Sequence, residues 1–314
     1  MLDDTGVGKG VRGVKVFLTG ATGVMGTSAA AALRAAGHEV GGLARTEAKA
    51  RELAGNGVRP AVASLFDTDA LAEAFRGYDA VCNLATHVPV GRASMLPGAW
   101  RTNDHIRTVG SQTVARAAKR AGVFRLIQES VTHVYADGGD DWLDVDSPLM
   151  VTRATEPAAE AETNASAFAC AHRVAVVLRF GTIVGDDPLT RWRLSRARAG
   201  HAIGIGDPSG WTHVVHPSDV GSALVAALYA PGGVYNVGAE PVRRSVLTST
   251  IASVAGQEQA TYLSKALLRL GGERMEPLTR SHRISCARFT ENTGWMPLHS
   301  RFSAGWLGDA LVNA

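Results

Sequence analysis

A glycine-rich turn near the start of the chain carries the strongest chemical signal in the sequence. The segment TGATGVMG occupies residues 19–26, directly after a β-branched and aromatic run at 14–19 and before an alanine-rich stretch. Between a strand and a helix, Gly20 makes the tight turn, Gly23 lets backbone approach a pyrophosphate, and Gly26 allows close helix packing. Free N–H groups and the dipole at the helix N-terminus favour the anion. The residues expected to bind a dinucleotide here are Gly20, Thr22, Gly23, Val24, Met25 and Gly26.

The end of the second expected strand bears on which dinucleotide is bound. NAD-specific proteins usually carry an acidic residue there for the ribose hydroxyls, and no acid occurs at 41–46. Arg45 instead offers a planar cation that suits a 2′-phosphate. The sequence therefore favours NADP(H), and a solvated surface arginine is the alternative interpretation of Arg45.

The elements that must position this turn alternate between strand and helix. Such alternation predicts an α/β fold, a Rossmann-type doubly wound parallel sheet with a smaller C-terminal substrate lobe. We expect strands at 14–19, 38–44, 79–84, 125–129 and 174–179, and helices at 28–36, 69–76, 102–121, 158–171, 189–199 and 218–230. The expected units are a flexible tail at 1–13, an NADP-binding Rossmann domain at 14–185, and a mainly substrate-binding lobe at 186–314 with some segments returning to the sheet.

Composition narrows the possible partners. The 314 residues are 46% hydrophobic and 19% charged, with a net charge of +3 and no basic block long enough to predict nucleic-acid binding. The three cysteines lack CxxC spacing, and no histidine spacing indicates a metal site. No apolar run reaches the length that crosses a bilayer. We expect a cytoplasmic protein with a small-molecule substrate, no membrane contact, and a monomeric or homodimeric state.

Further motifs give the chain a family resemblance along nearly its whole length. They are NLAT at 83–86, Asn103, SVTHVYAD at 130–137, LRFGTIVGD at 178–186 and WTHVVHPSDV at 211–220. With the glycine turn, they resemble the extended and atypical short-chain dehydrogenase/reductase group. That group includes nucleotide-sugar epimerases, dihydroflavonol-type reductases and NADP-binding sensors.

The resemblance implies roles for further residues. The nicotinamide ribose would be bordered by Leu84, Ala85 and Thr86, and the nicotinamide ring by Phe180 and Ile183. The segment SLFD at 64–67 resembles the adenine-contacting stretch, where Ser64 replaces the usual aspartate and the Leu65 backbone remains a candidate.

The family's catalytic tyrosine and lysine, four residues apart, are absent. No tyrosine lies between Tyr135 and Tyr229, and no lysine lies between Lys119 and Lys265. Alignment places Ala154 and Ala158 at the two positions. The family's serine or threonine position falls on Val131, so that either neighbouring hydroxyl, Ser130 or Thr132, is a candidate.

Other side chains are candidates for the proton transfer that the tyrosine and lysine perform in the family, and for contact with the substrate. His133 follows a predicted strand beside the expected nicotinamide, and an ordinary histidine pKa suits a proton donor. Tyr135 is expected to be structural. Substrate contact is expected from His87, Trp192 and His213, although core packing explains such residues equally well.

Hydride transfer can survive the loss of a general acid, since proton transfer contributes about 10²- to 10⁴-fold whereas juxtaposition contributes roughly 7 to 11 kcal/mol. The leading hypothesis is an NADPH-dependent reductase of ketoreductase type acting on a small, largely apolar carbonyl compound, as in natural-product tailoring. The alternatives are a non-catalytic NADP(H)-binding regulator and a nucleotide-sugar epimerase or dehydratase.

Overall fold

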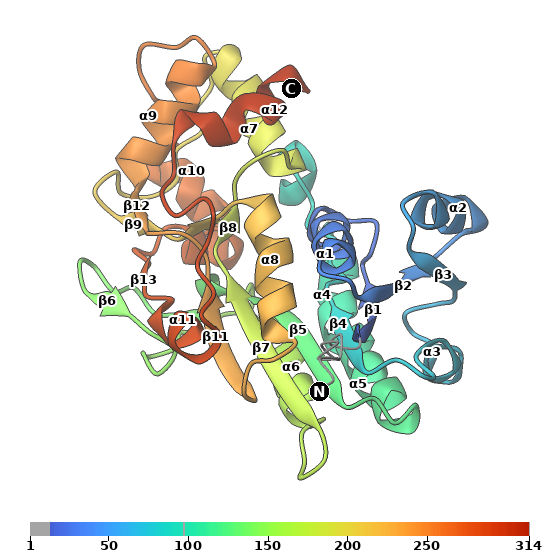
Figure 1. The fold of residues 1–314 in the computed structure, drawn as a ribbon. Coiled ribbons are helices and arrows are strands. Elements are labelled where there is room, and N and C mark those ends of the chain that lie inside the picture. Colours follow the sequence, from blue (N-terminus) through green and yellow to red (C-terminus); the bar gives the residue numbers. More distant parts are fainter. Residues whose placement is uncertain (1–12, 97, 314) are drawn as a thin grey trace, which may run out of the picture.

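The central feature is a seven-stranded parallel sheet, as Figure 1 shows for this computed structural model, which describes residues 13–96 and 98–313. Its strand order is β3-β2-β1-β4-β5-β7-β11. The strands are β1 (Lys15–Thr19), β2 (Glu39–Ala44), β3 (Arg59–Val62), β4 (Ala80–Asn83), β5 (Arg125–Val131), β7 (Val174–Phe180) and β11 (Gly233–Val237). The order reverses between β1 and β4, which is where doubly wound folds form their ligand crevice. The predicted fold class is confirmed.

Helices cover both faces of the sheet because successive strand residues point to opposite sides. Val16 and Leu18 pack on one side, and Phe17 packs on the other. The first face is covered by α1 (Val24–Ala35), α2 (Glu47–Gly55), α8 (Pro217–Ala227) and α11 (Ala287–Thr293). The second face is covered by α3 (Thr68–Ala74), α5 (Ser111–Arg120) and α6 (Glu156–Ser166), and α5 is preceded by α4 (Arg101–His105) and a π-helical turn, η2 (Ile106–Gly110).

A smaller lobe with its own apolar core lies beside the sheet, at the top of Figure 1. Its helices are α7 (Pro188–Arg198), α9 (Arg244–Val254), α10 (Lys265–Leu270), η6 (Ala304–Leu307) and α12 (Gly308–Val312). Two-residue strands make three small sheets, which pair β8 (Thr182–Ile183) with β10 (Val214–Val215), β9 (Trp211–Thr212) with β12 (Val242–Arg243), and β6 (Trp142–Leu143) with β13 (Arg283–Ile284). The single-turn helices are η1 (Gly91–Met95), η3 (Thr132–Val134), η4 (Gly272–Arg274) and η5 (Glu276–Leu278).

Segments beyond residue 185 return to the sheet layer, since β11 pairs with β7 and α8 packs against α1. The α1–α8 contact is close: the Ser28 hydroxyl donates to the Pro217 carbonyl at 2.6 Å and accepts from the Gly221 N–H at 3.2 Å. The domain boundary at 185 stays a prediction. The expected tail at 1–13 falls, apart from Gly13, outside the described residues.

The first helix is expected to be intolerant of bulk at Gly26. A Cβ added there would overlap the Gly20 carbonyl oxygen and lie 2.6 Å from the Ala21 Cα. Gly26→Ala should therefore lower the free energy of unfolding by about 1–3 kcal/mol, the usual cost of overpacking.

Gly55→Ala is the matched control, since a Cβ on Gly55, the last residue of α2, meets nothing within 4 Å. It should stabilise the protein by about 0.5–1 kcal/mol. Urea unfolding of both variants measures the difference, and equal effects would contradict the packing argument.

Candidate functional site

The glycine turn sits at the reversal point of the sheet, between the carboxyl ends of β1 and β4. Gly20 has φ +66°, and a Cβ on it would lie 2.6 Å from the Leu84 carbonyl oxygen and 2.8 Å from the Ala85 nitrogen. Gly20 thus lets the turn lie directly on the end of β4. The two segments expected to bind the dinucleotide, 19–26 and 84–86, are therefore neighbours in space.

The N-terminus of α1 has the features of an anion cradle. Its cap residue, Gly23, is exposed and has no side-chain cap, and the first turn holds no acidic residue. A Cβ on Gly23 would meet only the Gly20 carbonyl oxygen, at 3.3 Å. Thr22 and Val24 are partly exposed beside it, whereas Met25 is buried and packs in the core. Uncapped N–H groups with open space in front of them fit a dinucleotide pyrophosphate.

The expected adenosine end lies at the adjoining ends of β2 and β3. Arg45 is exposed directly after β2, and the next residue, Thr46, caps α2 by accepting from the Lys49 N–H. Leu65 is buried in the loop after β3, where its side chain faces Gly110. Arg45 and Leu65 therefore follow neighbouring strands, at the edge where an adenosine would extend from the turn.

The expected nicotinamide end lies at the carboxyl ends of β4 and β7. Leu84 and Phe180 are buried, whereas Ala85, Thr86 and Ile183 are partly exposed. The Thr132 hydroxyl points to the Phe180 carbonyl oxygen at 3.4 Å, which brings the segment after β5 against the end of β7. The roles of these residues in cofactor binding stay predictions.

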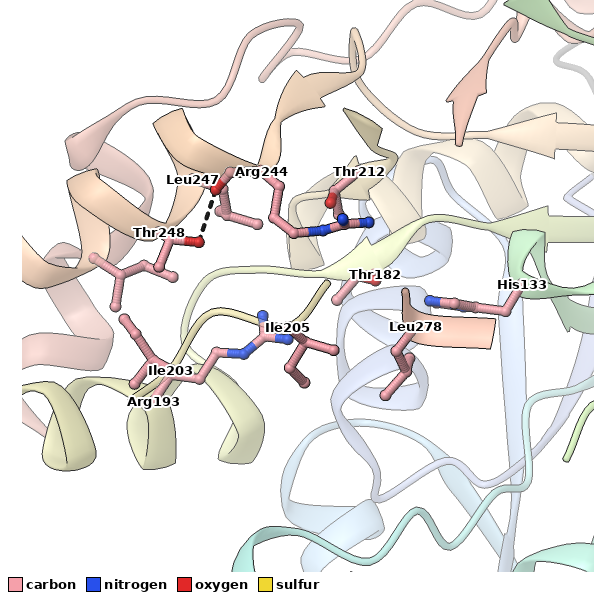
Figure 2. Close-up of a pocket in the computed structure, with 11 residues that line it drawn as sticks. His133, Thr182, Arg193, Ile203, Ile205, Thr212, Arg244, Leu247, Thr248 and Leu278 are labelled. Carbon is pink, nitrogen blue, oxygen red and sulfur yellow. Dashed lines mark hydrogen bonds between the residues drawn. The ribbon is translucent and has the colours of Figure 1, made fainter. Parts of the chain in front are cut away.

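A cavity opens where these strand ends meet the smaller lobe (Figure 2). Its cavity volume is about 50 Å³, and the surrounding space, including the part open to solvent, amounts to about 450 Å³. Apolar side chains, two arginines, three threonines and one histidine line it: His133, Thr182, Arg193, Ile203, Ile205, Thr212, Arg244, Leu247, Thr248, Ile251 and Leu278. A smaller cavity beside it shares His133 and Thr182 and adds Thr132 and His213. The predicted residues that the structure brings together here are thus Thr132, His133 and His213.

Ser130 lies apart from both cavities, in a buried polar network. Its hydroxyl donates to Glu162 Oε1 at 2.5 Å. Glu162 forms an ion pair with Arg179 at 2.6 Å, and Arg179 donates to the Tyr135 hydroxyl at 2.9 Å. The Tyr135 hydroxyl in turn donates to Asn236 Oδ1 at 2.8 Å. These contacts give Ser130 and Tyr135 structural partners and leave Thr132 as the hydroxyl beside the cavity.

Two of the expected substrate residues, His87 and Trp192, are not among the residues that line the cavities. His87 is exposed, and its N–H donates to Asn103 Oδ1 at 3.1 Å, so that Asn103 fixes the loop after β4. The Trp192 ring packs against Gly91, and the Arg196 guanidinium lies 5.2 Å from the ring centroid. Arg193 and Arg244, by contrast, line the cavity but were not predicted as site residues. The arginine-rich segment 189–199 was the available signal for Arg193, and nothing local singles out Arg244.

Alanines occupy the two positions where we expect the family's tyrosine and lysine to align. Ala154 lies, partly exposed, in the turn before α6. Ala158, on α6, is buried in a cluster with Val134, Leu143 and Ile284. Neither methyl side chain can transfer a proton.

Three histidines beside the cavities have strongly lowered pKa values. Burial, with the positive field of neighbouring histidines and arginines, lowers the pKa of His133 to about 3. Burial, with the field of His282, lowers the pKa of His213 to about 3, and burial lowers that of His282 to about 4. All three are therefore neutral at pH 7. His133 can donate or accept a hydrogen bond there, but it does not carry the extra proton that the sequence interpretation gave it.

The comparisons with known proteins agree with this architecture. The model of the NAD dependent epimerase/dehydratase family matches residues 16–238. A 3-diazoavenalumate denitrifying reductase from a Streptomyces species is 30% identical over 313 residues, covering 93% of this chain and 99% of its own. The chain belongs to the NAD-dependent epimerase/dehydratase family. The predicted resemblance to extended short-chain dehydrogenases is thereby confirmed, and membership gives a nicotinamide dinucleotide as the cofactor class.

Other family relatives are more distant or shorter in overlap. A 4-hydroxy-2-methyl-3-oxo-4-farnesyl-3,4-dihydroquinoline-1-oxide ketoreductase from Stigmatella aurantiaca is 30% identical over 128 residues, 40% of this chain and 36% of its own. Human epimerase family protein SDR39U1, solved with NADPH, superposes with a TM-score of 0.76 at 22% identity, covering 96% of this chain and 100% of its own. Thermus thermophilus UDP-glucose 4-epimerase, solved with NAD, has the same TM-score and coverage at 21% identity. Both structures share the fold.

Within the described residues, no helix is long and apolar enough to cross a membrane. The same residues include no group of three or more metal-ligating side chains arranged to hold an ion.

The buried neutral histidines predict sensitivity to acid. His213 and His282 are almost fully buried, with folded-state pKa values far below the ordinary 6.5. Between about pH 6.5 and 4 the unfolded chain binds protons that the folded chain does not. Above about pH 6.5 these histidines therefore do not lower the free energy of unfolding. As the pH falls through this window, each of them lowers the free energy of unfolding by about 1.4 kcal/mol per pH unit.

His282→Gln should reduce the slope of unfolding free energy against pH by about that amount. The control is His172→Gln, because His172 is exposed. Chemical denaturation at a series of pH values gives the slopes, and a slope for His282→Gln equal to that of the parent would refute the argument.

Proposed function

We propose that this protein is a cytoplasmic NADPH-dependent reductase of ketoreductase type that acts on a small, largely apolar carbonyl compound. One observation carries the proposal: a cavity that places five isoleucine and leucine side chains beside polar ones lies where β5 and β7 end, next to the segments expected to border a nicotinamide. A reductase needs its carbonyl substrate at that place. Family membership gives a nicotinamide dinucleotide as the cofactor class. We propose in addition that this cofactor is NADPH and that the substrate is a ketone.

The cofactor would be held by residues already described. The free N–H groups of the first residues of α1 would bind the pyrophosphate, Arg45 would pair with the 2′-phosphate, and Thr86 would border the nicotinamide ribose. When bound, a reduced nicotinamide supplies a hydride. The chain's own task is to orient the carbonyl carbon, exclude water and stabilise the oxyanion that forms.

The side chains near the cavity suit the stabilisation of an oxyanion. Arg193 and Arg244 line it, and no carboxylate is among its lining residues. The Thr132 and Thr182 hydroxyls and the neutral His133 ring offer hydrogen bonds beside this positive field. The final proton would then come from water or from a hydroxyl of the substrate.

The relatives support reduction over epimerisation. A reductase of a diazo compound and a ketoreductase both share about 30% identity with the chain over their aligned segments. Epimerisation by repeated oxidation and reduction needs an acid and a base in turn, and the tyrosine and lysine positions hold Ala154 and Ala158.

The test of this function is NADPH oxidation with a broad panel of aryl ketones and quinones. Turnover of a ketone supports the proposal. Tight NADPH binding without oxidation by any compound would favour the regulator instead, and interconversion of UDP-sugars would favour the epimerase.

Cofactor preference should depend on Arg45. Arg45→Gln should weaken NADPH binding roughly ten- to hundredfold and leave NADH binding unchanged, because one charge-assisted pair is worth about 1.5–3 kcal/mol. The control is Arg51→Gln, which removes an exposed arginine from α2. Fluorescence titration decides the matter, and equal affinities of the parent protein for NADPH and NADH would disprove the assignment.

Catalysis should depend on Thr132 and be nearly independent of Tyr135. With a reducible substrate, Thr132→Val should lower kcat about 10²-fold, the usual contribution of a positioned hydrogen bond to an oxyanion, and Tyr135→Phe should stay within about tenfold of the parent. Circular dichroism and NADPH affinity serve as controls for both variants. The opposite ranking would show that the chain uses Tyr135 as its acid.

A further inference from the structure

Two arginines of the smaller lobe project into the cavity. Arg193 comes from α7 and Arg244 from the start of α9, and Figure 2 shows the Arg193 guanidinium beside Ile205 and the Arg244 guanidinium beside Thr212. Elements far apart in the sequence thus place two positive charges in one cavity, together with aliphatic side chains.

Neither guanidinium forms an ion pair within the described residues. Arg244 donates to the backbone carbonyls of Asp207, at 2.7 Å, and Arg280, at 2.8 Å. Arg193 has no hydrogen bond with any described residue; burial lowers its pKa, and the field of the Asp187 carboxylate opposes that shift. A desolvated guanidinium without a direct carboxylate partner is costly.

Three other buried arginines have carboxylate partners. Arg107 pairs with Glu129 at 2.6 Å, Arg179 with Glu162 at 2.6 Å, and Arg280 with Glu276 at 2.5 Å. Buried Arg125 instead donates to the Ala227 and Ala230 carbonyls. Arg193 has neither kind of partner among the described residues, and an anion from outside the chain would supply one.

We propose that the substrate is an apolar carboxylate whose carboxyl group binds Arg193 and Arg244 while its body lies against Ile203, Leu247 and Leu278. The inference rests on the proposed function, since it names the substrate class of the same cavity. Guanidinium groups bind carboxylates through paired hydrogen bonds, and they are less strongly hydrated than ammonium groups, so that they suit a partly desolvated site.

The lining favours a carboxylate over a sugar diphosphate. A sugar nucleotide presents many hydroxyls that need hydrogen-bond partners, whereas isoleucine and leucine side chains form much of this wall. A single anionic group on an apolar body matches two arginines set among aliphatic side chains. The reacting carbonyl of such a molecule would lie toward His133 and Thr182, which follow β5 and β7.

The experiment measures binding and needs no turnover. Calorimetric titrations, with and without NADP⁺, would use three carboxylates, biphenyl-4-carboxylate, 6-phenylhexanoate and decanoate, each with its neutral carboxamide. A titration with UDP-glucose tests whether the cavity binds a sugar diphosphate instead. We expect at least one carboxylate to bind about tenfold or more tightly than its amide.

Arg193→Gln is the decisive variant, and Arg191→Gln is its matched control. Arg191 lies on the same helix, pairs with Asp186 and does not line the cavity. Arg193→Gln should remove the preference for carboxylate over amide, whereas Arg191→Gln should keep it. Since Arg193 makes no bonds within the described protein, Arg193→Gln should also leave the melting temperature unchanged or raise it, which a structural arginine would not do.

Three results would overturn the proposal: no saturable binding of any carboxylate at about 1 mM, equal binding of acid and amide, or selective loss of UDP-glucose binding in Arg193→Gln. Failure of the proposed function is a separate observation. It would leave carboxylate binding intact with no NADPH oxidation by any ketone, including keto acids.

Discussion

The contact between the 20–26 turn and the carboxyl end of β4 sets the geometry of the whole site. Because Gly20 has a positive φ and no Cβ, its backbone lies on the Leu84 carbonyl, and because Gly26 has no Cβ, α1 begins directly behind the turn. The uncapped amides of α1 and the segment after β4 are consequently presented side by side at the reversal of strand order. The other parts of the site lie along this edge. Arg45 directly follows β2, η3 places Thr132 and His133 directly after β5, and the smaller lobe contributes the remaining wall of the cavity.

A buried ion pair stabilises the structure behind this edge. Glu162 and Arg179 tie α6 to β7 and engage Ser130 and Tyr135, and Ala158 packs nearby among apolar side chains. Breaking such a pair typically costs about 3–5 kcal/mol, since it leaves a buried charge without a partner. Ser130 and Tyr135 thus have structural partners, whereas the arginines, threonines and neutral histidine that we propose to act on the substrate line the cavities.

Most strands and helices and the glycine turn could be predicted from local sequence. The features that could not be predicted depend on contacts between distant segments. Strands such as 174–179 and helices such as 218–230 follow from apolar runs and alanine-rich stretches, and the structure has them as β7 and α8 with small shifts at their ends. No helix or strand was predicted for the segment 47–62, which forms α2 and β3. The prediction missed β3 because it is a short, largely exposed edge strand with a weak apolar pattern. The turn was predictable because three glycines within seven residues carry a geometric requirement.

The cavity was harder to predict, because its lining comes from four or more separated segments. His133 was singled out from its place after a strand, but its low pKa depends first on its burial, and then on His282, His213 and two arginines that no local pattern links to it. Ser130 and Thr132 were equivalent in sequence, and only the contact of Ser130 with Glu162 separates them. Trp192, expected at the substrate, packs instead against the turn at Gly91.

We propose above all that the free amides in the first turn of α1, beside Gly23, bind the cofactor's pyrophosphate. The most direct measurement is the NADPH affinity of Gly23→Val, because a Cβ there touches only one carbonyl oxygen, at 3.3 Å, and extends into the space reserved for the phosphates. We expect affinity to fall at least about 100-fold while circular dichroism and the melting temperature stay near those of the parent. Unchanged NADPH affinity in a folded Gly23→Val protein would place the cofactor elsewhere and contradict this account.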